Sequence, residues 1–232
     1  MHRLVLWDID GTLVSCGRWG RLALERGAAE AAGLDDVPHV EMSGKTDPQI
    51  VGEILALAGA APDATERLVP EALVVAERRL AQWAPEIAEE GFVQPGVEKL
   101  LERLDDIDGV RQSLVTGNVV RNAEVKLGVF GLDRFIDFAA GAYGSDHAER
   151  DRLVPIALGR MAELRGERFA PDEAWIIGDT VHDLRCARAA GSRCILVGTG
   201  KEGYASVRDL EADRVFEDLA DTDSVLELLL GP

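Results

Sequence analysis

The sequence of 232 residues is poor in cysteine and in aromatic side chains, which make up 5% of it. Its three cysteines, Cys16, Cys186 and Cys194, form no C-x-x-C pair, and their odd number argues against a disulfide framework. No segment approaches the ~18 consecutive apolar residues that a membrane-spanning helix needs, and the first residues look like a strand rather than a signal peptide. These absences predict a cytoplasmic protein without a membrane partner.

Basic residues are scarce too, since 25 Lys and Arg stand against 42 Asp and Glu, giving a formal charge of −17. Such a surface repels the phosphate backbone of nucleic acids, so a nucleic-acid partner is not expected. It also repels anionic metabolites, and a phosphate site would need a local cation or backbone N–H groups. With 47% hydrophobic residues and no low-complexity tract, the chain is expected to be globular. Its composition leaves the oligomeric state open, and a monomer or a weak homodimer is the default expectation.

Short apolar segments alternate with longer helical patterns along the sequence. Strands are predicted over residues 4–7, 113–115, 136–139, 175–177 and 194–197, and helices over 97–104 and 154–161. Strand followed by helix, repeated in this way, indicates a parallel sheet with helices on both faces. The predicted fold class is therefore α/β, with a Rossmann-like, three-layer α/β/α core.

Residues 18–90 interrupt this alternation. They are rich in Ala, Leu, Glu and Arg, with helical patterns over 22–32, 50–58 and 68–83 and no convincing strand. The sequence Gln-Pro-Gly at 94–96 indicates the return to the sheet. We therefore predict a core domain of residues 1–15 and 92–232, and an inserted α-helical cap domain of residues 16–91.

Two carboxylates follow the first predicted strand, in the sequence Asp-Ile-Asp-Gly-Thr-Leu at residues 8–13. Extended backbone would aim Asp8 and Asp10 to the same side. A turn alone would explain Asp10-Gly11. Two carboxylates held close together nevertheless repel each other unless a cation or a shared proton compensates them, which suggests a metal.

Polar residues also follow two later strands. Thr116-Gly117-Asn118 offers a hydroxyl and a flexible backbone N–H, although these residues are also typical of an ordinary turn. Asp179 and Asp183 open a predicted helix, where capping by Asp179 is the simpler explanation. Because the carboxyl ends of parallel strands share one edge, the three loops should converge there.

These three motifs, in this order along the chain, resemble the haloacid dehalogenase superfamily, and the helical insertion is similar to its mobile cap in phosphoglycolate-phosphatase-like members. The resemblance implies that Asp8 attacks phosphorus to form an aspartyl phosphate. Asp10 would protonate the leaving alcohol and later deprotonate the attacking water. Thr116 would be catalytic, with Gly117 and Asn118 at the phosphoryl group.

The resemblance also implies a Mg²⁺ cofactor held by oxygen ligands from the core loops. The implied ligands are Asp8, Asp179, Asp183 and the backbone carbonyl of Asp10. Such a cation would bring a phosphate into a chain of charge −17.

A basic side chain against the phosphoryl group is implied as well, and this sequence offers two candidates. Lys126 and Arg150 are both possible catalytic residues, with Lys126 favoured because apolar neighbours would aim it at the core edge. In the cap, Lys45 resembles residues that meet the substrate, whereas a loop and a new helix explain Thr46 and Asp47.

The function predicted from these observations is a Mg²⁺-dependent phosphomonoester hydrolase acting on a small phosphorylated metabolite. Asp10 argues against dehalogenases and phosphonoacetaldehyde hydrolases, which typically lack this second aspartate. A hexose-phosphate mutase of the same superfamily remains an alternative. A catalytically idle metabolite-binding module is a second one, although Asp8, Asp10, Asp179 and Asp183 are all retained.

Overall fold

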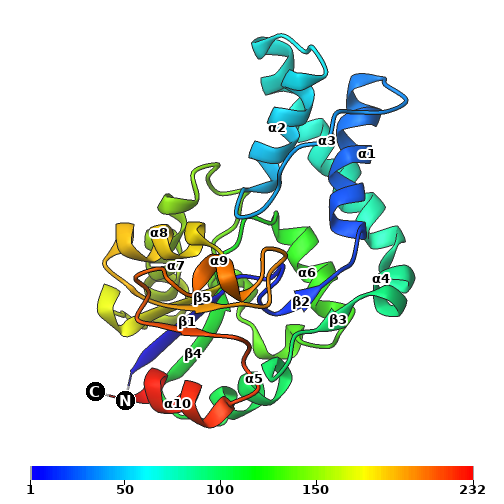
Figure 1. Ribbon diagram of the computed structural model, residues 1–232. Helices are drawn as coiled ribbons and strands as arrows, with labels where there is room; N and C mark the ends of the chain where they lie inside the picture. The colour runs from blue at the N-terminus through cyan, green and yellow to red at the C-terminus, as the bar shows by residue number, and fades with distance from the viewer. Residues whose placement is uncertain (1, 232) are drawn as a thin grey trace.

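The computed structural model describes residues 2–231 and is built around a five-stranded parallel sheet (Figure 1). The strands follow the order β4-β1-β5-β6-β7 across the sheet, and each neighbouring pair is parallel. Their bounds are Arg3–Trp7 (β1), Val110–Leu114 (β4), Ala174–Gly178 (β5), Arg193–Val197 (β6) and Arg214–Phe216 (β7). The predicted α/β fold class is confirmed.

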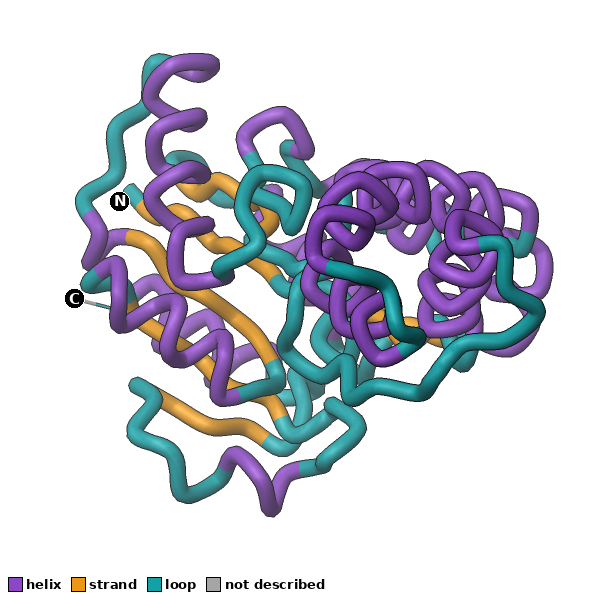
Figure 2. The backbone as a smooth tube through the Cα atoms, turned by 90° about the horizontal axis from the view of Figure 1, so that it is seen from above, coloured by secondary structure: helices purple, strands orange, loops and turns teal. Residues whose placement is uncertain are grey.

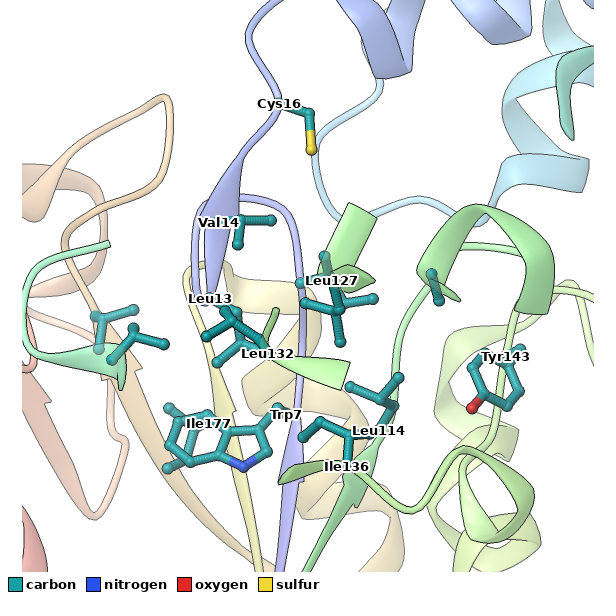
Figure 3. Packing of buried hydrophobic residues seen from close by; sticks show 14 of the residues in the cluster. Trp7, Leu13, Val14, Cys16, Leu114, Leu127, Leu132, Ile136, Tyr143 and Ile177 are labelled. Atoms are coloured by element: carbon teal, nitrogen blue, oxygen red, sulfur yellow. The ribbon is translucent and has the colours of Figure 1, made fainter. Parts of the chain in front are cut away.

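Alternate residues of the strands pack against helices on opposite faces of the sheet, as the two-residue period of a strand requires. On one face, Trp7 and Ile177 belong to an apolar cluster with α5 (Val97–Asp105), α6 (Val120–Gly128) and α10 (Thr222–Leu230), part of which Figure 3 shows. On the other face, Leu6 and Ile176 meet α7 (Leu153–Arg160), α8 (Val181–Ala190) and α9 (Tyr204–Val207). The core therefore has three layers, and both faces of the sheet are buried.

Four helices lie between the first strand of the sheet and the return to it. They are α1 (Trp19–Ala32), α2 (Asp47–Leu57), α3 (Pro62–Gln82) and α4 (Ala84–Glu90), and α1–α3 stand beyond one end of the strands (Figures 1 and 2). A short antiparallel pair, β2 (Val14–Ser15) with β3 (Phe92–Val93), joins the chain entering and leaving this insertion. Helices α1 and α3 pack closely where Gly27 faces Ala72. Only glycine allows this approach, because a Cβ at Gly27 would lie 2.3 Å from the Ala72 carbonyl oxygen.

Short helical turns complete the described chain. Single 3-10 turns are η1 (Asp133–Phe135), η2 (Phe138–Ala140), η3 (Arg150–Arg152) and η5 (Pro171–Glu173), and a π-helical turn, η4 (Met161–Arg165), extends α7. Among residues 2–231, no helix is long and apolar enough to cross a bilayer.

The strand predicted over residues 136–139 is wrong. The Asp137 carboxylate accepts a hydrogen bond from the Ala140 N–H and pairs with Arg165, which bends the backbone into η2. The Asp137 N–H still donates to the Gln112 carbonyl oxygen of β4, and an isolated bridge pairs Val115 with Ala142. The division into residues 1–15 and 92–232 against 16–91 stays a prediction.

Candidate active site

Sheet register brings the three polar loops to one edge. Trp7 pairs with Leu114 on one side and Ile177 on the other, so the residues that follow these three leave the sheet at the same level. The Asp8 N–H donates to the Ile177 carbonyl oxygen at 2.9 Å, which fixes the start of the first loop. The predicted convergence of the loops is therefore present in the structure.

Three carboxylates gather at this edge. Oxygen atoms of Asp8, Asp179 and Asp183 lie within 4.8 Å of one another. The Thr12 hydroxyl donates to Asp179 Oδ1 at 3.1 Å, whereas Asp183 Oδ2 accepts from the Thr180 N–H at 3.0 Å and the Thr180 hydroxyl at 2.7 Å. Thr180, not Asp179, occupies the N-cap of α8, so helix capping does not account for Asp179.

Two glycines make room for these carboxylates. A Cβ on Gly178 would lie 2.0 Å from the Asp183 carboxyl carbon, and one on Gly11 would lie 2.5 Å from Asp179 Oδ2. Gly11 also has a φ of +84°, which disfavours any other residue. The glycines of both motifs are thus required by the closeness of the loops.

Arg150 is the cation inside this carboxylate group. Its Nη2 lies 3.1 Å from Asp8 Oδ2 and also contacts Asp183 Oδ1, and its side chain is 6% exposed. Burial raises the pKa of Asp8 to about 6, Arg150 opposes that shift, and the Asp183 carboxylate adds to it. Burial, Asp183 and Asp8 together raise the pKa of Asp179 well above its ordinary value.

One guanidinium therefore faces three carboxylates, and burial, followed by the neighbouring carboxylates, raises the pKa values of Asp8 and Asp179. A divalent cation among these oxygens would supply the missing charge, and carboxylate ligands suit Mg²⁺. The residues present thus fit a metal site that Asp8, Asp179 and Asp183 would hold. The Asp10 carboxylate is not part of this group, and its backbone carbonyl remains a predicted ligand.

Lys126 lies at a different carboxylate. Its Nζ donates to Asp10 Oδ2 at 2.5 Å and to Asn118 Oδ1 at 2.7 Å. The Asn118 amide in turn donates to Asp10 Oδ2 and to the Thr116 hydroxyl oxygen, each at 2.9 Å. Burial disfavours the charged ammonium, but Asp10 together with Cys16 and Asp47 more than offsets this, and the pKa of Lys126 is raised. The Lys126 side chain is 6% exposed, whereas that of Asp10 is 49% exposed.

A cavity of about 500 Å³ connects these groups with the helical insertion. Asp8, Asp10, Asn118 and Arg150 line it from the core, and α1, α2 and the segment before α2 line it from the insertion. Lys45 lies on its wall, as a substrate contact requires, but its ammonium also pairs with Glu53 of α2 at 2.5 Å.

The structure brings the residues predicted from the sequence together at this cavity, and adds one that was not predicted. Its candidates Asp8, Asp10, Gly117, Asn118, Lys126, Arg150, Asp179 and Lys45 all line the cavity, and Thr116 and Asp183 contact members of that set. Thr46 caps α2, as the new helix start predicted. Asp47 was missed as a cavity residue, because an acid before proline at a helix start is an ordinary pattern. The roles assigned to all of them stay predictions.

Comparison with known proteins agrees with this geometry. Residues 5–188 match the model of the family described as haloacid dehalogenase-like hydrolase. A phosphoglycolate phosphatase of Rhodospirillum rubrum is 30% identical over 227 residues, covering 95% of this chain and 89% of the relative. A protein of Mycobacterium tuberculosis named tyrosine-protein kinase PtkA is 28% identical, covering 98% and 72%.

The fold is also found among solved structures. CbbY from Rhodobacter sphaeroides, in complex with phosphate, aligns with a TM-score of 0.67 at 21% identity, covering 95% of this chain and 96% of that one. Since the family model spans most of the sequence and the carboxylate cluster lies at the expected strand ends, family membership is established. The chain belongs to the haloacid dehalogenase-like hydrolases and is a phosphatase similar to the phosphoglycolate phosphatases.

Proposed function

We propose that the protein is a Mg²⁺-dependent phosphomonoester hydrolase that acts on a small phosphorylated metabolite through an aspartyl phosphate on Asp8. One observation supports this most directly. Asp8 combines a cation at 3.1 Å, two neighbouring carboxylates and access to a cavity of about 500 Å³. These features support a carboxylate nucleophile, a guanidinium for the phosphoryl group and space for a leaving group at one place.

In the first step, an Asp8 oxygen attacks phosphorus and the bond to the leaving oxygen breaks, while Asp10 gives its proton to that oxygen. In the second step, Asp10 takes a proton from water, whose oxygen attacks phosphorus and releases Asp8 and inorganic phosphate. The half-exposed carboxylate of Asp10, held by Lys126 and Asn118, suits this exchange with the substrate and with water. Thr116 and the Gly117 N–H are assigned to a phosphoryl oxygen.

Arg150 is assigned to the phosphoryl group, in preference to Lys126, because it contacts the nucleophile whereas Lys126 contacts Asp10. When bound, Mg²⁺ would neutralise the carboxylate cluster and draw electron density from phosphorus. Asp8, Asp179 and Asp183 are the side chains assigned to hold it.

The helices of residues 16–91 are assigned to a cap over the core formed by residues 1–15 and 92–232. Support comes from the cavity, whose wall combines residues of both parts, including Lys45 from the insertion and Asn118 from the sheet edge. A substrate in this cavity would be shielded from bulk water, which protects the aspartyl phosphate from uncontrolled hydrolysis.

Phosphate release tests this proposal. The purified protein with Mg²⁺ should hydrolyse p-nitrophenyl phosphate and members of a panel of sugar, polyol and short-chain acid phosphates. The Asp8→Asn variant should lose at least about 10⁴-fold in kcat, because it lacks the nucleophile at nearly unchanged volume. Its circular dichroism should match that of the wild type. Failure of the wild type on every ester, or comparable turnover by the variant, would refute the proposal.

A further inference from the structure

A second carboxylate lies beside Asp10 in the wall of the cavity. Asp47, the first residue of α2, lines the same cavity as Asp10, Asn118 and Lys126, and only 6% of it is exposed. Burial raises the pKa of Asp47, Lys126 lowers it, and the Asp10 carboxylate adds to the rise. Asp47 and Asp10 therefore influence each other electrostatically, and both line the cavity.

Hydrogen bonds fix the Asp47 carboxylate in this place. Its Oδ2 accepts from the Val119 N–H at 2.9 Å and from the Asn122 amide at 3.0 Å, both near the start of α6. The Asp47 N–H donates to the Gly117 carbonyl oxygen at 2.8 Å. A side chain tied at both its backbone and its carboxylate cannot turn away when a substrate enters.

The chain on either side of this contact is equally constrained. A Cβ on Gly117 would lie 2.2 Å from the Lys45 carbonyl oxygen, and one on Gly144 would lie 2.1 Å from the Gly117 carbonyl oxygen. The Thr46 hydroxyl also donates to the Ala148 carbonyl oxygen at 3.1 Å. The segment of residues 44–47 is thus packed directly on the core loops.

The cations near Asp47 are already engaged. Lys126 donates to Asp10 and also acts electrostatically on Asp47, so one ammonium serves two carboxylates on this side. The other basic residues of the cavity wall, apart from Arg150, each have an acidic partner. The pairs are Arg21 with Glu25 at 3.7 Å, Lys45 with Glu53 at 2.5 Å, and Lys201 with Glu41 at 3.5 Å.

We infer that Asp47 is a specificity-determining residue, which restricts the enzyme to phosphomonoesters whose leaving alcohol carries no negative charge of its own. The inference rests on the proposed function and adds a substrate class to it. A carboxylate or second phosphate on the leaving group would have to lie near two fixed carboxylates without a free cation, and such like-charge contacts reject a ligand. Phosphoglycolate, whose leaving alcohol carries a carboxylate, is therefore a poorer substrate than the similarly sized ethylene glycol phosphate.

Two matched pairs of substrates test this. Phosphoglycolate is compared with ethylene glycol phosphate, and 3-phosphoglycerate with glycerol 3-phosphate, by kcat/KM for phosphate release with Mg²⁺. The wild type should favour the uncharged member of each pair by about tenfold or more. Asp47→Asn keeps an oxygen acceptor for the Val119 N–H and removes the charge, so it should reduce this ratio by about tenfold.

Asp63→Asn is the matched control, because it removes an exposed first-turn carboxylate from α3 outside the cavity and should leave the ratio unchanged. If Asp47→Asn fails to fold by circular dichroism, Asp47→Ser provides the same neutralisation with a hydroxyl acceptor. A wild-type preference for the charged esters, or a ratio equal in wild type and neutral variants, would overturn the inference alone. Absence of hydrolysis of every ester, p-nitrophenyl phosphate included, would overturn the proposed function and the inference with it.

Discussion

The two ends of the active-site cavity differ in how their charges balance. At the nucleophile end, Asp8, Asp179 and Asp183 share one cation, Arg150. At the other end, Asp10 and Asp47 share Lys126. The first end is short of two positive charges and the second of only one, so a divalent metal fits the first, whereas the second fits a neutral group. Charge balance, more than residue type, thus indicates which part of a substrate each end receives.

Removing Arg150 is the strongest way to test the nucleophile end. Arg150→Met should lower kcat by about 10²- to 10³-fold, because the guanidinium is the one basic side chain that contacts Asp8 among the described residues. Steady-state phosphate release measures this. Arg152→Met is the control, since Arg152 lies two residues away with its side chain 68% exposed and should retain nearly full activity. Equal losses in both variants would contradict the assignment of Arg150.

The shortage of positive charge at the same end should also make the free energy of unfolding depend on pH when no metal is bound. Because the folded-state pKa of Asp8 is raised from 3.8 to about 6, the folded protein binds this proton more tightly than the unfolded chain. The contribution of Asp8 to the free energy of unfolding is therefore largest below about pH 3. It should fall by about 3 kcal/mol in total as the pH rises to about 7, where the folded protein has lost the proton as well. Urea denaturation in EDTA, compared with that of Asp8→Asn, isolates this contribution.

Added Mg²⁺ should reduce this loss at pH 7 in the wild type, because it compensates the ionised cluster. Asp8→Asn should show a smaller gain from Mg²⁺. If the difference between wild type and variant rises with pH instead, Asp8 is stabilised in its charged form and the nucleophile end is not short of positive charge.

At the other end of the cavity, replacing Lys126 should have the smallest effect on kcat, and one that depends on the type of ester. Lys126→Met should lower kcat by about tenfold for alkyl phosphates, because Asp10 loses the ammonium that positions it for protonating the leaving oxygen. Turnover of p-nitrophenyl phosphate, whose leaving group needs no proton, should change much less. Lys126→Arg should restore part of the loss, whereas an equal decrease for both ester types would indicate a merely structural role.

Sequence alone could predict the parts of the site that belong to strand ends. Asp8, Thr116 and Asp179 follow apolar segments whose parallel pairing follows from the alternation of strands and helices, so their convergence needs no further information. The strand over residues 136–139 could not be excluded, because its apolar residues conceal the interaction of Asp137 with Arg165. Short β7 was missed because Arg214 begins it and leaves too brief an apolar segment.

The pairing of charged side chains could not be predicted from the sequence either. Lys126 was favoured over Arg150 for the phosphoryl group because apolar neighbours surround it, but they bury it beside Asp10 instead. Which cation meets which carboxylate depends on how α6 and η3 are placed over the sheet edge, and on contacts between residues more than 100 positions apart. Asp47 shows the same limit, since its partners Val119 and Asn122 are 72 and 75 residues away.

The direct contact of residues 44–47 with Gly117 and Gly144 has a consequence for how product leaves. Backbone meets backbone here, so no side chain can rotate aside to open a passage at this point. Exit through this side would require the peptide segments themselves to separate, at the cost of the hydrogen bond between Asp47 and Gly117. Alanine at Gly117 would push the two segments apart, and would thereby exchange retention of the substrate for faster departure of phosphate.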